Sequence, residues 1–206
     1  METTAIITAF VTLLVVIDPI GLAPLFVALT KGADAVHRRG VALRACVIAI
    51  LLLTAFGLFG ESLLNFVGIS MPAFRIAGGI LLFLTALDML FERRTHRRQE
   101  QAAKADDPSV FPLATPLIAG PGAMASMILL VGQSNSWQGI LTVHLVMVAV
   151  ILVVFLFFLA AGLMERALGD TGINVATRLL GMLLAALSVQ FVLDGLASFG
   201  LATLAG

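Results

Sequence analysis

Hydrophobic residues run along this chain in six long stretches that short polar connections separate. A helix needs about 20 apolar residues to cross the hydrocarbon core of a bilayer, and each stretch reaches that length. The stretches are residues 4–30, 41–60, 71–91, 111–132, 139–163 and 176–203. The pattern predicts an all-α polytopic membrane protein with six transmembrane helices, in a single transmembrane domain over residues 1–206.

One connection is long and charged, with the sequence ERRTHRRQEQAAKADDP from Glu92 to Pro108. It separates a first half, 4–91, from a second half, 111–203, and we predict a charged cytoplasmic loop over 92–110. The halves resemble each other: VIDPIGLAPLF has a counterpart in LIAGPGAMASM, and AFRIAGGILLFL in ATRLLGMLLAAL. Each half has three stretches, an odd number, so the second half must enter the membrane upside down. We therefore predict two inverted three-helix repeats, the arrangement of many secondary transporters.

Both the first and the fourth stretch contain helix-breaking residues near their centres. The first has Asp18 in IDPIGLAP, and the fourth has Gly-Pro-Gly at 120–122. Proline lacks an amide hydrogen and glycine lowers helix propensity. Inside a bilayer, broken backbone is tolerated only when it is buried in protein or lines a cavity. We predict that the first and fourth helices are broken and that the breaks face each other.

A half-helix that begins in mid-membrane presents amide donors and a partial positive charge, which suit an anionic group such as a substrate carboxylate. The predicted substrate-binding residues at the two breaks are Asp18, Pro19, Ile20, Gly21, Ala119, Gly120, Pro121, Gly122 and Ala123. Proline kinks used only for packing are the alternative interpretation of these residues.

Composition supports the membrane assignment, because 60% of residues are hydrophobic and 12% are charged, with a mean hydropathy of +1.10. A soluble domain carries about a quarter charged residues. The first stretch has no preceding Lys or Arg, unlike a cleavable signal peptide, so we expect it in the mature protein. The single cysteine, Cys46, excludes an internal disulfide. Nucleic-acid binding is not expected; the expected partners are the lipid bilayer and a small-molecule substrate.

The positive charges predict the orientation of the chain. Eleven of the twelve Lys and Arg residues fall on or near one side of the predicted spans, and Arg75 alone starts from the other. Basic residues concentrate in cytoplasmic loops, so the crowded side is predicted to be cytoplasmic. Both termini are then outside the cytoplasm.

The motifs DPIGLAPLF, PLATPLIAGPGAMAS, RIAGGILLFLTALDML and GMLLAALSVQFVLDGL together resemble the MarC family of bacterial inner-membrane proteins. The resemblance covers nearly the whole chain. It implies six spans, a pair of inverted repeats and, from some members, proton-linked movement of glycine- or alanine-sized amino acids. One departure is Leu22, where the family pattern usually has Asn after the DPxG glycine.

Asp18 has two possible roles that are compatible with each other. It can cap the half-helix that starts at Pro19 by accepting from backbone amides. It can also bind a substrate ammonium or take up a coupling proton, since an acid inside the membrane is commonly functional.

Arg75 and Arg178 occupy equivalent positions in the third and sixth spans and are candidate coupling or gating residues. Long basic side chains near span ends also snorkel to the interface, which is the competing interpretation. Possible acidic partners are Glu61, Glu165, Asp88 and Asp194.

The favoured function is a secondary transporter of small neutral amino acids that works by alternating access. No GxxxxGK[ST] loop is present, so a proton gradient is the expected driving force, with Na⁺ as the alternative. An exporter of other small solutes or drugs and a non-transporting scaffold are the competing functions. An intramembrane hydrolase using Ser126 and His144 lacks a supporting motif, and neither a metal nor a cofactor is expected.

Overall fold

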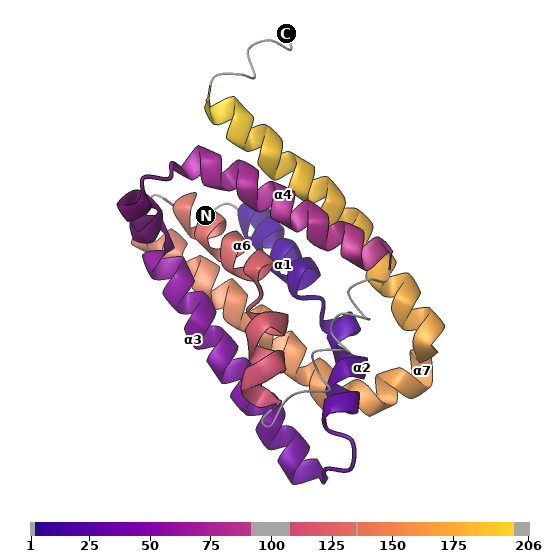
Figure 1. Ribbon diagram of the computed structural model, residues 1–206. Helices are drawn as coiled ribbons and strands as arrows, with labels where there is room; N and C mark the ends of the chain where they lie inside the picture. The colour runs from indigo at the N-terminus through magenta and orange to yellow at the C-terminus, as the bar shows by residue number, and fades with distance from the viewer. Residues whose placement is uncertain (1–2, 92–107, 135, 200–206) are drawn as a thin grey trace.

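The computed structural model describes residues 3–91, 108–134 and 136–199 (Figure 1), so the predicted charged loop lies almost wholly outside the described residues. Every regular element in the described part of the chain is a helix, which confirms the all-α class. The elements are α1 (Thr3–Ile17), α2 (Pro19–Leu29), α3 (Ala35–Val67), α4 (Met71–Leu90), η1 (Ser109–Ile118), α6 (Pro121–Gly132) and α7 (Trp137–Ser198).

Six membrane-spanning segments can be counted in this arrangement by length and composition. Five are long apolar helical segments: Thr3–Leu29, Ala35–Val67, Met71–Leu90, Trp137–Leu163 and Thr171–Ser198. The sixth is the pair η1 and α6, bent by 54°, when the pair is taken as one broken span. The helical path of α7 is interrupted at Gly169 (φ 60°, ψ 176°), so α7 contains the fifth and the sixth predicted spans. The protein is thus a multi-pass membrane protein.

The order of elements is the same in the two halves of the chain. Each half begins with a broken span, α1–α2 or η1–α6, and continues with two longer helices. In Figure 1, α2 runs down the view from its break, whereas α6 runs up the view from its own. The corresponding half-helices therefore run in opposite directions, as two inverted repeats require.

Helix α6 forms the centre of the molecule, since nine of its twelve residues are buried. Glycines on the neighbouring helices allow this close packing. A Cβ atom on Gly60 of α3 would collide with Ile128, and one on Gly78 of α4 would lie 3.1 Å from Leu129 Cδ1. Small residues at helix interfaces are the usual means of close approach in membranes, where lipid is as apolar as the protein interior.

Helix α4 packs along the C-terminal half of α7 (Figure 1). A Cβ atom on Gly79 would meet Val192, and one on Gly181 would meet Met89. The contacts advance along α4 as they retreat along α7, so the two helices are antiparallel. Gly78, Gly79 and Gly181 thus allow the close approach of these helices.

The outer surface of the bundle is apolar. Leu51 and Phe59 on α3 are 64% and 67% exposed, and Leu152 and Leu156 on α7 are more than half exposed. Side chains of this kind are stable on a surface that faces acyl chains, which is the environment expected of membrane-spanning helices.

Candidate functional site: the paired breaks

The first break is a single residue, Asp18, between α1 and α2. Asp18 has φ 59° and ψ 68°, and it is the only non-glycine residue with positive φ in the described part of the chain. Its amide donates to the Leu14 carbonyl at 2.9 Å, and its carbonyl accepts from the Leu22 amide at 3.0 Å. The backbone therefore ends one helix and starts the next at this residue, because left-handed backbone cannot continue a right-handed helix.

The side chain of Asp18 caps the helix that it starts. The Gly21 amide donates to Asp18 Oδ1 at 3.0 Å, and the Asp18 residue is fully buried. The carboxylate also lies at the positive end of the α2 dipole, which stabilises its charge. A Cβ atom on Gly21 would overlap the Asp18 carboxylate, so glycine is needed here. The geometry agrees with the capping role; a direct role in binding or proton transfer stays a prediction.

The second break has a different origin. Gly120 has φ −82° and ψ 170°, an extended conformation that any residue adopts. However, a Cβ atom on Gly120 would collide with the backbone carbonyl oxygen of Pro116. Glycine is required for close approach rather than for its dihedral angles. As a result, no side chain caps the N-terminus of α6.

The helical segment before the second break is interrupted at two residues. Within η1, Phe111 and Thr115 have extended backbone, and each precedes a proline, Pro112 or Pro116. The residue before proline is disfavoured in the helical region, which explains both interruptions. The prediction of a break at 120–122 was therefore correct but incomplete, and the prolines of PLATPLIAGPG were the missed signal.

The two breaks lie next to each other in the folded chain. A Cβ atom on Gly122, at the start of α6, would lie 3.2 Å from Val16 Cγ1, and Val16 is two residues before Asp18. Leu82 and Thr85 of α4 border the same position, at 3.2 and 3.8 Å. The sequence prediction that the breaks face each other inside the bundle agrees with this packing.

The predicted site residues differ in accessibility. Asp18, Pro19, Ala119, Gly120, Gly122 and Ala123 are buried, Ile20 and Gly21 are half-buried, and Pro121 is exposed. The first residue of α6 is therefore exposed, whereas the carboxylate at the tip of α2 is enclosed. Leu22, which replaces the Asn of the family pattern, is fully buried in the first turn of α2.

The two arginines that the repeat aligns have unlike surroundings. Arg75, near the start of α4, is half-buried, and its buried Nε atom has no hydrogen-bond partner. Arg178 is exposed. Of the acids considered as partners, Asp194 accepts a hydrogen bond from Gln190 Nε2 at 2.7 Å, and the side chain of Glu165 lies outside the described residues. The coupling or gating role of both arginines stays a prediction.

Four further side-chain atoms are buried without a hydrogen-bond partner: Thr12 Oγ1, Ser126 Oγ, His144 Nε2 and Thr177 Oγ1. The Nδ1 atom of His144 donates to the Ile140 carbonyl at 2.8 Å, since a carbonyl oxygen can only accept. Ser126 Oγ and His144 Nε2 are thus not hydrogen-bonded to each other. Thr12 was missed by sequence reasoning, because a threonine in an apolar stretch usually bonds to its own helix.

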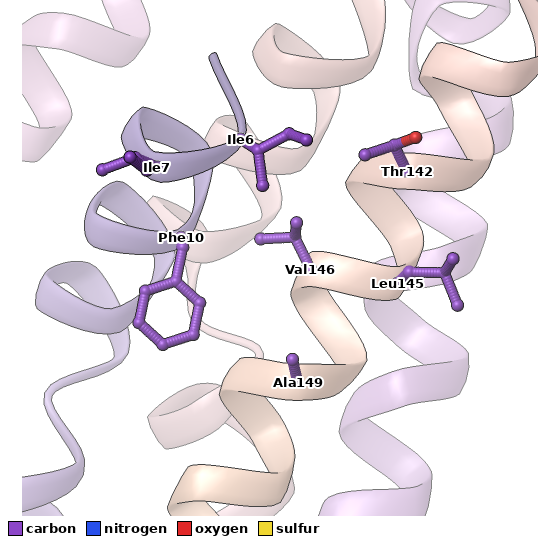
Figure 2. A pocket seen from close by; sticks show the side chains of 7 residues that line it. All are labelled: Ile6, Ile7, Phe10, Thr142, Leu145, Val146 and Ala149. Carbon is purple, nitrogen blue, oxygen red and sulfur yellow. The ribbon is translucent and has the colours of Figure 1, made fainter. Parts of the chain in front are cut away.

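An apolar groove of about 410 Å³ lies between α1 and α7, away from the breaks. Figure 2 shows its lining, with Ile6, Ile7 and Phe10 on one side and Thr142, Leu145, Val146 and Ala149 on the other. The Thr142 hydroxyl donates to the Gln138 carbonyl of its own helix. The groove suits an acyl chain rather than a charged solute.

Residues 3–199 match the model of a protein family described as MarC family integral membrane protein. The chain is 37% identical to a UPF0056 membrane protein of Aquifex aeolicus, over 92% of this chain and 91% of the relative. It is 36% identical to a UPF0056 membrane protein of Methanocaldococcus jannaschii, over 95% and 98%. The UPF0056 inner membrane protein YhgN of Escherichia coli is 35% identical, over 93% and 95%. No solved structure matches the chain.

Proposed function

This chain belongs to the MarC family of integral membrane proteins, and we propose that it is a secondary transporter of small neutral amino acids such as glycine or alanine. The observation that carries the proposal is the contact between two mid-span breaks, at Asp18 and at Gly120–Gly122. We place the protein in the inner (plasma) membrane, with both termini outside the cytoplasm, because basic residues crowd the opposite side of the spans.

The paired breaks offer both charges that a zwitterion needs. At the first break α1 ends, and the last carbonyls of a helix carry a partial negative charge that suits an ammonium group. At the second break α6 begins without a side-chain cap. The first amides of α6, those of Gly122 and Ala123, are donors that suit a carboxylate. The packed surroundings, with Val16 and Leu82 against Gly122, favour a solute with a small side chain.

The proposed driving force is a proton gradient. The sequence contains no loop of the kind that binds nucleotide phosphates, and Asp18 supplies a carboxyl group at the paired breaks. Protonation of that carboxyl would remove the charge that caps α2, so a proton could change the conformation of the first break. Sodium coupling is the alternative, and the transport assay must distinguish it from proton coupling.

The test is flux in proteoliposomes that contain the purified protein. With an imposed pH gradient, we expect saturable uptake of radiolabelled glycine and alanine, and competition by unlabelled alanine but not by leucine. Vesicles without protein are the control, and replacing the pH gradient by a sodium gradient identifies the coupling ion. Efflux from preloaded vesicles separates import from export. No flux of either amino acid in either direction would contradict the proposal and favour the scaffold alternative.

A further inference from the structure

Two hydroxyl groups in the centre of the molecule lack partners. Thr12 on α1 and Ser126 on α6 are both fully buried, and neither Thr12 Oγ1 nor Ser126 Oγ has a hydrogen-bond partner. A buried hydroxyl without a partner destabilises a protein, and most helical Ser and Thr residues avoid this by bonding to a carbonyl of their own helix. Thr30, also buried, does so with the Phe26 carbonyl.

The register of α1 and α6 places the two hydroxyls at the same height along the paired helices. Helix α1 runs towards its break and α6 runs away from its own, so the two helices are antiparallel where they pack (Figure 1). They meet near the breaks at Val16 and Gly122. Thr12 is four residues before Val16 and Ser126 is four residues after Gly122. Each hydroxyl therefore lies one helical turn from that contact, in the same direction and on the same face.

The other faces of α6 are occupied, which supports this placement of Ser126. Met127 and Ile128 pack against Gly57 and Gly60 of α3, and Leu129 packs against Gly78 of α4. Gly122 lies between Val16 of α1 and Leu82 and Thr85 of α4, and Ser126 is on the same side of α6, one turn further along.

We infer that Thr12 and Ser126 form a second polar site for the transported solute, one helical turn from the breaks, between α1 and α6. The inference rests on the proposed transport function. Each hydroxyl can donate to a carboxylate or accept from an ammonium group, so the pair suits the same small zwitterion. In the conformation described here α1 and α6 are closed against each other. When they separate during the transport cycle, the solute provides the hydrogen bonds that the closed conformation lacks.

Removal of the hydroxyls tests the inference. Thr12→Val and Ser126→Ala should each reduce alanine flux at least tenfold, while the melting temperature stays unchanged or rises, because an unpartnered polar group has been replaced by an apolar one. Ser188→Ala is the matched buried control and Thr8→Val an exposed one, since these hydroxyls donate to the Ala185 and Thr4 carbonyls. The controls should keep flux within twofold of the parent. Parental flux in both test variants would overturn the inference.

A labelling experiment tests the site without assuming a solute. In a Cys46→Ala background, Ser126→Cys should react with a membrane-impermeant thiol reagent in proteoliposomes, and alanine should slow the reaction. Leu129→Cys, equally buried but against Gly78, is the control and should stay unreactive. Labelling at position 126 that no amino acid slows would support the polar site and count against the proposed solute. No labelling at position 126 while flux persists would overturn the polar site alone.

Discussion

The two breaks lie side by side, yet the half-helices that follow them begin differently. Helix α2 is capped by its own acid, because Asp18 adopts left-handed backbone and its carboxylate accepts from the Gly21 amide. Helix α6 has no side-chain cap, because the Pro116 carbonyl fills the space where a side chain on Gly120 would lie. One half of the chain therefore supplies its own anion, while the other leaves its amides to a ligand.

This difference gives unequal roles to the N-termini of α2 and α6, although the sequence alone predicted the same role for both. A carboxylate that approached α2 would meet the charge of Asp18, whereas one that approached α6 would meet only amide donors. Pro121 at the tip of α6 is also exposed, while Asp18 is enclosed. We therefore expect the solute carboxylate at the start of α6 and its ammonium group at the end of α1, with a structural or proton-linked role for the Asp18 side chain.

The largest effect is expected from Gly120→Ala. The new Cβ atom would collide with backbone rather than with a flexible side chain, so the free energy of unfolding should fall by about 3 kcal/mol, the upper end of typical overpacking costs. Thermal unfolding in detergent measures it. Gly132→Ala, at the other end of α6, is the control, because its Cβ would meet only the mobile end of Met71. Equal stability of the two variants would contradict the packing explanation.

Asp18→Leu should have the next largest effect and lower the free energy of unfolding by about 2–3 kcal/mol. Removal of a cap costs about 1 kcal/mol, and a left-handed conformation costs a residue such as leucine about 1–2 kcal/mol more. Asp18→Asn should keep most of the stability, since an amide oxygen still accepts from Gly21 and asparagine tolerates this backbone. If both variants melt and transport like the parent, Asp18 has no important role. A stable Asp18→Asn variant that loses only proton-driven accumulation would assign coupling to this acid.

Pro121→Ala should affect transport more than folding. Proline is well tolerated at the first position of a helix, so stability should change little. The restored amide would help to straighten the bend between η1 and α6 and misplace the donors, and we expect flux to fall about fivefold, which is ~1 kcal/mol. Pro19→Ala at the self-capped tip is the matched variant and should reduce flux less than Pro121→Ala. Unchanged kinetics for Pro121→Ala would remove this bend from the mechanism.

The smallest effect is expected from Gly21→Ala, which should displace the Asp18 carboxylate from the tip of α2. The free energy of unfolding should fall by about 0.5–1 kcal/mol, as it does when a helix loses its cap. In an Asp18→Ala background the same change should cost almost nothing, because the group that it displaces is gone. A double-mutant cycle of melting free energies measures this coupling. Additive losses would show that Gly21 acts independently of the cap.

The amino-acid sequence alone was enough to predict the all-α class, the places of the spans and the breaks in the first and fourth. These features are local: the length of an apolar run determines a span, and proline, glycine or aspartate changes the backbone within its own turn. Even the capping role of Asp18 follows from a partner three residues away.

Only the tertiary structure decided which groups meet between helices. The carbonyl that excludes a side chain at Gly120 and the contact of Val16 with Gly122 depend on backbone geometry and helix rotation. The shared level of Thr12 and Ser126 depends on helix register. The spans are apolar on nearly every face, and lipid is as apolar as the protein interior, so hydrophobic periodicity says little about which face turns inward. Close packing of small residues makes that choice, and it becomes visible only in the folded chain.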